Sequence, residues 1–166
     1  MADRAVNSVG LFVDVQNVYY TCRQIHKANF DYNAFWQRAT QDRELVCAVA
    51  YATDRGDPQQ EKFQNILKAI GFEVKLKPMV QRRDGSAKAD WDVGIALDIF
   101  EAAANCETVV LVSGDGDFEI LLNRVRDRFN TRSEVYGVRQ LTANPLIAAA
   151  DKFIPIESQL LLPNKK

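Results

Sequence analysis

The chain has 166 residues, a net charge of −1 at neutral pH and an apolar content of 47%. This length is enough for one domain with a hydrophobic core, and the composition excludes a disordered or fibrous protein. The near-neutral charge excludes the basic excess of proteins that grip long nucleic acids non-specifically, so any nucleic-acid contact needs a local patch.

Cysteine usage and hydropathy indicate the compartment. Cys22, Cys47 and Cys106 are isolated, and with a single histidine they predict no zinc site. A sparse, odd number of cysteines suits a reducing compartment. The start of the chain does not resemble a signal peptide, and no apolar stretch reaches the roughly 18 residues of a membrane helix. We expect a cytoplasmic protein with no membrane partner.

The first half of the chain predicts three strands and three helices. In chain order they are strand Val9–Val15, helices Val18–Lys27 and Asp31–Gln41, strand Leu45–Thr53, helix Gln59–Ile70 and strand Glu73–Pro78. The helix Gln59–Ile70 has apolar residues at helical spacing and stops at Gly71, because glycine commonly ends helices.

The second half begins with the loop Arg82–Lys88 and then alternates helices and strands. The predicted order is helix Trp91–Ala104, strand Thr108–Ser113, helix Phe118–Phe129, strand Arg132–Val138, helix Asn144–Ala150 and a short strand Lys152–Ile156. Apolar residues on several sides of the helix Trp91–Ala104, including Leu97 and Phe100, predict that this helix is largely buried.

Strands that alternate with helices predict βαβ units with right-handed crossovers. The runs Val9–Val15, Leu45–Thr53 and Thr108–Ser113 are nearly continuous in apolar residues, as expected for strands buried on both faces of a parallel sheet. The predicted fold class is therefore α/β: a three-layer α/β/α sandwich with a mainly parallel sheet. We expect a single domain over residues 1–158 and a C-terminal tail over residues 159–166.

Polar residues follow two of the buried strands at their carboxyl ends. Asp14 ends the first strand and is followed by Asn17, whereas Ser113, Asp115 and Asp117 follow the strand Thr108–Ser113. Ligands of open parallel sheets bind outside the carboxyl ends of the strands. We therefore expect these side chains to share one edge of the sheet.

Two further aspartates belong to the helix Trp91–Ala104. Asp92 lies near the helix start and can face the same edge of the sheet. Asp98 lies about 9 Å further along the helix axis, at ~1.5 Å per residue. Asp98 is therefore expected to support the site rather than to touch a metal.

Carboxylates gathered in one concavity repel each other, and a hard cation removes that cost. Mg²⁺ and Mn²⁺ prefer oxygen ligands, and either can activate water and polarise a phosphoryl oxygen. The pattern thus predicts Mg²⁺ or Mn²⁺ bound by Asp14, Asp92, Asp115 and Asp117. Hydrolysis of phosphodiesters is the natural use of such a site.

Most of these residues also have a structural interpretation. Asp117 could cap the helix that follows it, and Asn17 could cap the helix after the first strand. Asp92 could interact favourably with the dipole at the start of its helix. Asp14 lacks such an explanation, because a buried carboxylate without partners is costly. The basic residues before the acidic helix are either a solvated loop or a rim that contacts phosphate; they are Lys75, Lys77, Arg82, Arg83 and Lys88.

Three motifs, LFVDVQN, DWDVGIALD and VVLVSGDGDF, resemble those of the NYN domain, specifically its LabA-like bacterial branch in the PIN-like nuclease superfamily. The resemblance runs from about Gly10 to Ile156. It implies a PIN-like α/β/α sandwich and a metal-dependent ribonuclease site. The resemblance implies that four aspartates are catalytic metal ligands: Asp14, Asp92, Asp115 and Asp117. It implies substrate binding by Asn17, Ser113 and Lys88, and it matches Asp98 to the later helix aspartate of the family.

The leading hypothesis is a ribonuclease that uses Mg²⁺ or Mn²⁺ and acts on RNA, expected to be single-stranded. The alternative is a non-catalytic RNA-binding or regulatory module that retains the site, which the near-neutral charge favours. A haloacid-dehalogenase type of phosphatase is disfavoured, because the stretch from Asp14 to Gln16 lacks a second aspartate. PIN-like relatives commonly dimerise, so the resemblance allows a homodimer, although no apolar stripe in the sequence argues for one.

Overall fold

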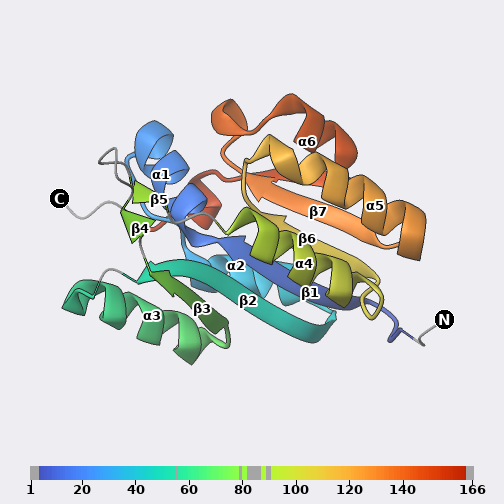
Figure 1. The fold of residues 1–166 in the computed structure, drawn as a ribbon, viewed down its shortest axis with the longest axis horizontal. Helices are drawn as coiled ribbons and strands as arrows, with labels where there is room; N and C mark the ends of the chain where they lie inside the picture. Colours follow the sequence, from blue (N-terminus) through green and yellow to red (C-terminus); the bar gives the residue numbers. More distant parts are fainter. Residues whose placement is uncertain (1–3, 55, 79, 82–86, 89–90, 164–166) are drawn as a thin grey trace.

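The computed structural model describes residues 4–54, 56–78, 80–81, 87–88 and 91–163. Six parallel strands form the main sheet, in the spatial order β3-β2-β1-β6-β7-β8 (Figure 1). Their bounds are β1 Ser8–Asp14, β2 Glu44–Asp54, β3 Glu73–Pro78, β6 Thr108–Val112, β7 Arg132–Gly137 and β8 Lys152–Pro155. The strands β4 (Val80–Gln81) and β5 (Ala87–Lys88) form a separate antiparallel pair.

Helices cover both faces of this sheet and create two hydrophobic cores. One core packs against α1 (Val15–His26), α2 (Tyr32–Thr40) and α3 (Pro58–Ile70). The other packs against α4 (Asp92–Ala103), α5 (Glu119–Phe129) and α6 (Asn144–Ala149), with α4 and α5 in front of the sheet and α2 behind it in Figure 1. The predicted three-layer α/β/α sandwich is confirmed.

Short 3₁₀ turns complete the chain: η1 (Gly116–Phe118), η2 (Arg139–Leu141) and η3 (Ser158–Leu160). The last of these begins a segment that packs on the domain. The backbone N–H of Leu162 donates to the carbonyl of Asn29 over 2.8 Å, and Leu161 forms a bridge with Phe30. Residues 160–162 of the expected tail therefore pair with the segment that directly precedes α2.

All six predicted strands and all six predicted helices are present, with small differences at their ends. The helix α1 begins at Val15 rather than at Val18, because the Asp14 carboxylate accepts a hydrogen bond from the N–H of Asn17 over 3.4 Å and caps the helix. The helix α3 ends at Ile70, as predicted. Gly71 follows it with a positive φ of 134°, and a Cβ there would lie 2.6 Å from the Trp36 ring.

Two predictions about burial are wrong. The prediction for β2 fails over its first residues, because β3 pairs with β2 only from Val49 onward and leaves Val46 45% exposed. The helix α4 is not largely buried: Leu97 is 61% exposed and Phe100 38%. One side of α4 packs on the sheet through Ile95 and its neighbours, and the apolar residues on the opposite side remain at the surface.

The order of the strands reverses between β1 and β6, which are neighbours in the sheet. From β1 the chain continues to one side, through β2 and β3. From β6 it continues to the other side, through β7 and β8. The helices that follow β1 and β6 therefore pack on opposite faces, and their connections separate at this point. Parallel sheets bind ligands at such a reversal.

Candidate metal centre

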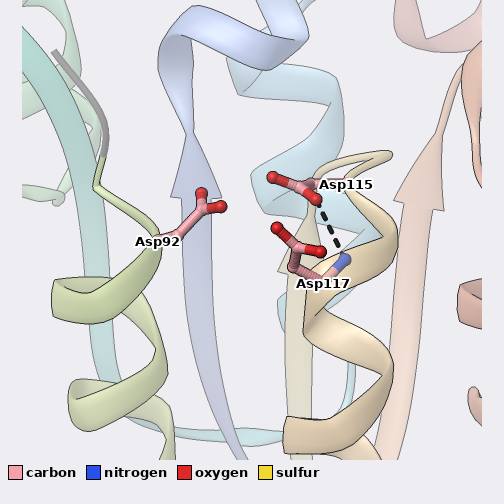
Figure 2. Close-up of side chains that lie close together, drawn as sticks. All are labelled: Asp92, Asp115 and Asp117. Atoms are coloured by element: carbon pink, nitrogen blue, oxygen red, sulfur yellow. Dashed lines mark hydrogen bonds between the residues drawn. The ribbon is translucent and has the colours of Figure 1, made fainter. Parts of the chain in front are cut away.

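Three aspartates meet at the carboxyl end of the sheet (Figure 2). Asp92 is the first residue of α4 and faces Asp115 and Asp117, which come from the turn after β6. Each offers one carboxylate oxygen, and these oxygens lie within 4.8 Å of one another. Asp92 and Asp115 are partly buried, whereas Asp117 is exposed. We name this set the acidic group.

Hydrogen bonds inside the turn hold two members of the acidic group. The Asp115 carboxylate accepts from the backbone N–H of Asp117 over 2.9 Å and caps η1. The N–H of Asp115 donates to the hydroxyl oxygen of Ser113, a buried residue, over 3.2 Å. The helix α5 has no side-chain cap, so Asp117 does not have the capping role that was one of its interpretations, and its carboxylate faces the group.

The end of β1 is tied to this turn by two contacts. The Ser113 hydroxyl donates to the Asp14 carboxylate over 3.3 Å, and the N–H of Gly114 donates to the side-chain oxygen of Asn17 over 3.0 Å. A Cβ at position 114 would lie 2.7 Å from the Leu141 carbonyl oxygen, so only glycine fits this approach. Asn17 thus does not cap α1; it fixes the position of the turn.

The structure brings the predicted site residues together only in part. Within the described residues, the acidic group contains Asp92, Asp115 and Asp117. Asp14 is not a member, and it is linked to the group through the Ser113 hydroxyl. Lys88 pairs with Val80 through its backbone, but its side chain lies outside the described part of the structure, as do Arg82, Arg83 and Asp90.

Asp98 lies elsewhere on α4 and is held by partners from two strands. Its Oδ2 accepts a hydrogen bond from the Tyr51 hydroxyl over 2.8 Å. The same oxygen forms an ion pair with the Lys75 ammonium over 2.7 Å. Burial raises the pKa of Tyr51, and the hydrogen bond to Asp98 raises the pKa of both Tyr51 and Lys75. The sequence analysis did not predict these contacts of Asp98. They depend on the register of β2 and β3, which places Tyr51 beside Lys75.

The two described lysines of the predicted basic rim have partners within the domain. Lys75 pairs with Asp98, and the Lys77 ammonium lies 5.3 Å from the centre of the Trp91 ring. Trp91 in turn donates its indole N–H to the Ala52 carbonyl over 2.9 Å and packs on Tyr51. Trp91 is therefore a packing residue beside Asp92.

The chemistry of the acidic group suits a hard divalent cation. All its donors are carboxylate oxygens, and it contains neither a histidine nor a cysteine. Mg²⁺ and Mn²⁺ prefer oxygen ligands and bind through a few carboxylates while they keep part of their water. Three like charges this close repel each other, and a bound cation would neutralise that repulsion. The residues present therefore fit the predicted metal.

Comparisons with known proteins identify relatives of this chain. The NYN domain model matches residues 8–157. The chain is 30% identical over 159 residues to the low amplitude and bright protein LabA of Synechococcus elongatus, covering 89% of this chain and 83% of that protein. A crystal structure of a Vibrio parahaemolyticus protein of unknown function is 54% identical, with a TM-score of 0.90 and coverage of 94% of this chain and 96% of that one. The chain belongs to the NYN domain family.

Proposed function

We propose that the protein is a divalent-metal-dependent ribonuclease that hydrolyses phosphodiesters of single-stranded RNA. The observation that carries this proposal is the convergence of the Asp92, Asp115 and Asp117 carboxylates within 4.8 Å at the reversal of strand order. Membership of the NYN domain family supports it. Structural roles alone would not need three carboxylates aimed at one point, because their mutual repulsion is unfavourable.

In this proposal the residues of the acidic group hold Mg²⁺ or Mn²⁺. When bound, such a cation polarises a phosphoryl oxygen and makes water a better nucleophile. Asp14 contacts Ser113 and adds negative charge beside the turn. Asn17 and Ser113 keep the turn that carries Asp115 in place. Lys88 is proposed to contact a phosphate of the strand. Asp98 acts from a distance, by fixing α4 to β2 and β3.

The alternative is a non-catalytic RNA-binding or regulatory module. The observation that favours it is the engagement of Lys75 and Lys77 within the domain, which lowers the positive charge available for a long strand. Both functions place RNA at the same edge of the sheet, and turnover separates them. The cytoplasmic location and the homodimer stay predictions. None of the helices formed by the described residues is long and apolar enough to cross a membrane.

The test is cleavage of an end-labelled single-stranded RNA by the purified protein, with Mg²⁺, Mn²⁺ or a chelator. The wild type should cleave only with metal, and Asp92→Asn should lose cleavage, because it removes a ligand charge. Asp127→Asn is a matched control, because Asp127 is an exposed aspartate on α5 outside the acidic group. Equal cleavage by the wild type and Asp92→Asn would overturn the site assignment. Metal-independent retention of RNA without cleavage would establish the alternative.

A further inference from the structure

A cavity of about 410 Å³ lies at the same edge of the sheet, among α1, α2, α3 and the end of β2. Its size falls within the range of about 300–1,000 Å³ that is usual for small-molecule sites. Val15 and Gln16 form part of its wall, and they directly follow Asp14 along the chain. The cavity therefore lies beside the end of β1, on the face of the sheet that α1, α2 and α3 cover, whereas the acidic group lies on the α4 side.

One polar atom in this cavity has an unmet hydrogen-bonding requirement. Thr53 lines the cavity and is only 5% exposed, and its hydroxyl has no hydrogen-bond partner among the described residues. Buried hydroxyl groups are nearly always paired, because leaving one unpaired is costly. A ligand with a donor or acceptor at this point would satisfy the Thr53 hydroxyl.

Aromatic rings line the cavity at its surface and in its interior. Tyr19 and Tyr20 are each 52% exposed, and their ring centres lie 5.6 Å apart. Tyr32 and Phe63 form a second edge-to-face pair deeper in the wall, also 5.6 Å apart. Exposed tyrosines are good stacking partners for planar rings such as nucleic-acid bases.

The described residues around the cavity offer a phosphate no cationic partner. None of the residues that line it in the described structure is a lysine or an arginine. Its two carboxylates belong to Asp31 and Asp57, which cap α2 and α3 by accepting from the N–H groups of Ala34 and Gln60 over 3.0 and 2.8 Å. A neutral planar ring fits this wall, and the amide side chains of Gln16 and Asn33 supply donors and acceptors for its edge.

We propose that the cavity binds one unpaired base of an RNA strand whose backbone passes the acidic group. The ring would stack on Tyr20, and its polar edge would bond to the Thr53 hydroxyl. This inference rests on the proposed function for the identity of the strand. Binding of the base itself requires neither metal nor cleavage, so the two proposals can fail separately.

The experiment measures the affinity of the full chain for a short fluorescent single-stranded RNA by anisotropy, in chelator so that no cleavage occurs. Tyr20→Ala should weaken binding about tenfold, the usual effect of removing one stacking partner. The affinity is also compared among four homopolymer RNAs, each made of one of the four bases. Thr53→Val keeps the side-chain shape and should reduce the difference in affinity among them. Ile120→Ala, on α5 and 68% exposed, is the control and should bind like the wild type.

A second probe separates the base from the backbone. The same RNA is prepared with single abasic positions, and one such position should weaken wild-type binding about as much as Tyr20→Ala does, because stacking is lost either way. In the Tyr20→Ala protein that position should have little further effect. Equal binding of intact and abasic RNA by the wild type, or unchanged binding by Tyr20→Ala, overturns the inference.

The outcomes also separate this inference from the proposed function. If the wild type never cleaves RNA but Tyr20→Ala weakens binding, the ribonuclease proposal fails and the base site stands. If the wild type cleaves with metal and Tyr20→Ala binds and cleaves normally, the base site fails and the ribonuclease stands. Binding of an apolar dye in the cavity without competition from RNA would assign the cavity to another ligand and would also overturn the inference.

Discussion

The two sides of the sheet edge at the end of β1 have opposite chemistry. On the α4 side, the acidic group presents three carboxylates, and hydrogen bonds within the turn hold Asp115 in place. On the α1 side, the cavity presents aromatic rings, no described cation and the unpaired hydroxyl of Thr53. One edge of the sheet thus has clustered carboxylates on one side and, on the other, an aromatic wall without a described cation.

The contrast arises where the chain leaves β1. Asp14 is the last residue of the strand and contacts Ser113 of the turn, whereas Val15 and Gln16 begin α1 and line the cavity. The acidic side is held by polar contacts within the turn after β6 and between that turn and the end of β1. The cavity side is shaped by three helices that approach from different parts of the chain. Changes on the two sides should therefore affect different measurements.

The largest expected effect is on the acidic side, at Asp115. Asp115→Asn should lower the rate of metal-dependent RNA cleavage by at least about 100-fold, because supporting residues of metal sites already cost 10- to 100-fold. Its amide oxygen can still cap η1, so urea unfolding should be close to that of the wild type. Asp115→Ala should lose cleavage and also about 1 kcal/mol of stability, because the cap is lost. Wild-type cleavage by Asp115→Asn would remove Asp115 from the site.

The next effect concerns metal binding at Asp117, measured by thermal unfolding with and without Mn²⁺. At a concentration about 100 times its Kd, Mn²⁺ should stabilise the wild type by about 2.7 kcal/mol. That corresponds to a Tm increase on the order of 5–10 °C for a domain of this size. Asp117→Asn should lose most of this increase, yet its metal-free Tm should equal or exceed that of the wild type, because one of three repelling charges is removed.

The sign of the metal-free change makes the Asp117 test specific. A general loss of structure would lower the Tm in both conditions. An acidic surface with no metal site would give equal small increases with Mn²⁺ in the wild type and in Asp117→Asn. Either result would contradict the assignment of a cation to the acidic group.

The smallest effect is on the cavity side, at Thr53. Thr53→Val should raise the free energy of unfolding by about 1 kcal/mol and the Tm by roughly 2–4 °C, because a buried unpaired hydroxyl is removed without a change of shape. Thr142→Val is the matched control. The Thr142 hydroxyl is also buried but donates to the Val138 carbonyl over 2.8 Å, so this change should destabilise the protein. A destabilised Thr53→Val would show that its hydroxyl has a partner and would weaken the contrast between the two sides.

Local patterns in the sequence determined the elements and the edge on which the site lies. Runs of apolar and β-branched residues predict the strands of the main sheet, and the nearly continuous runs of β1 and β6 indicate strands buried on both faces. Gly71 ends α3 for a local reason, its positive φ. Asp14 and Asp115 could be placed at one edge from the sequence, because parallel strands end on the same side. The family motifs add the expectation of a metal.

Only the tertiary structure decided which of these side chains meet. Asp92 reaches Asp115 and Asp117 because α4 and η1 pack beside each other, whereas Asp14 contacts Ser113 instead. The partners of Asp98 depend on strand register, and the exposure of Leu97 depends on which side of α4 meets the sheet.

The cavity at Thr53 likewise needs three helices and a strand that are distant in sequence. Distances between such segments follow from crossovers and packing, and no periodicity along the chain encodes them. The sequence by itself therefore determined the elements of this protein and the edge they share. The folded chain decided that this edge has an acidic side and an aromatic one.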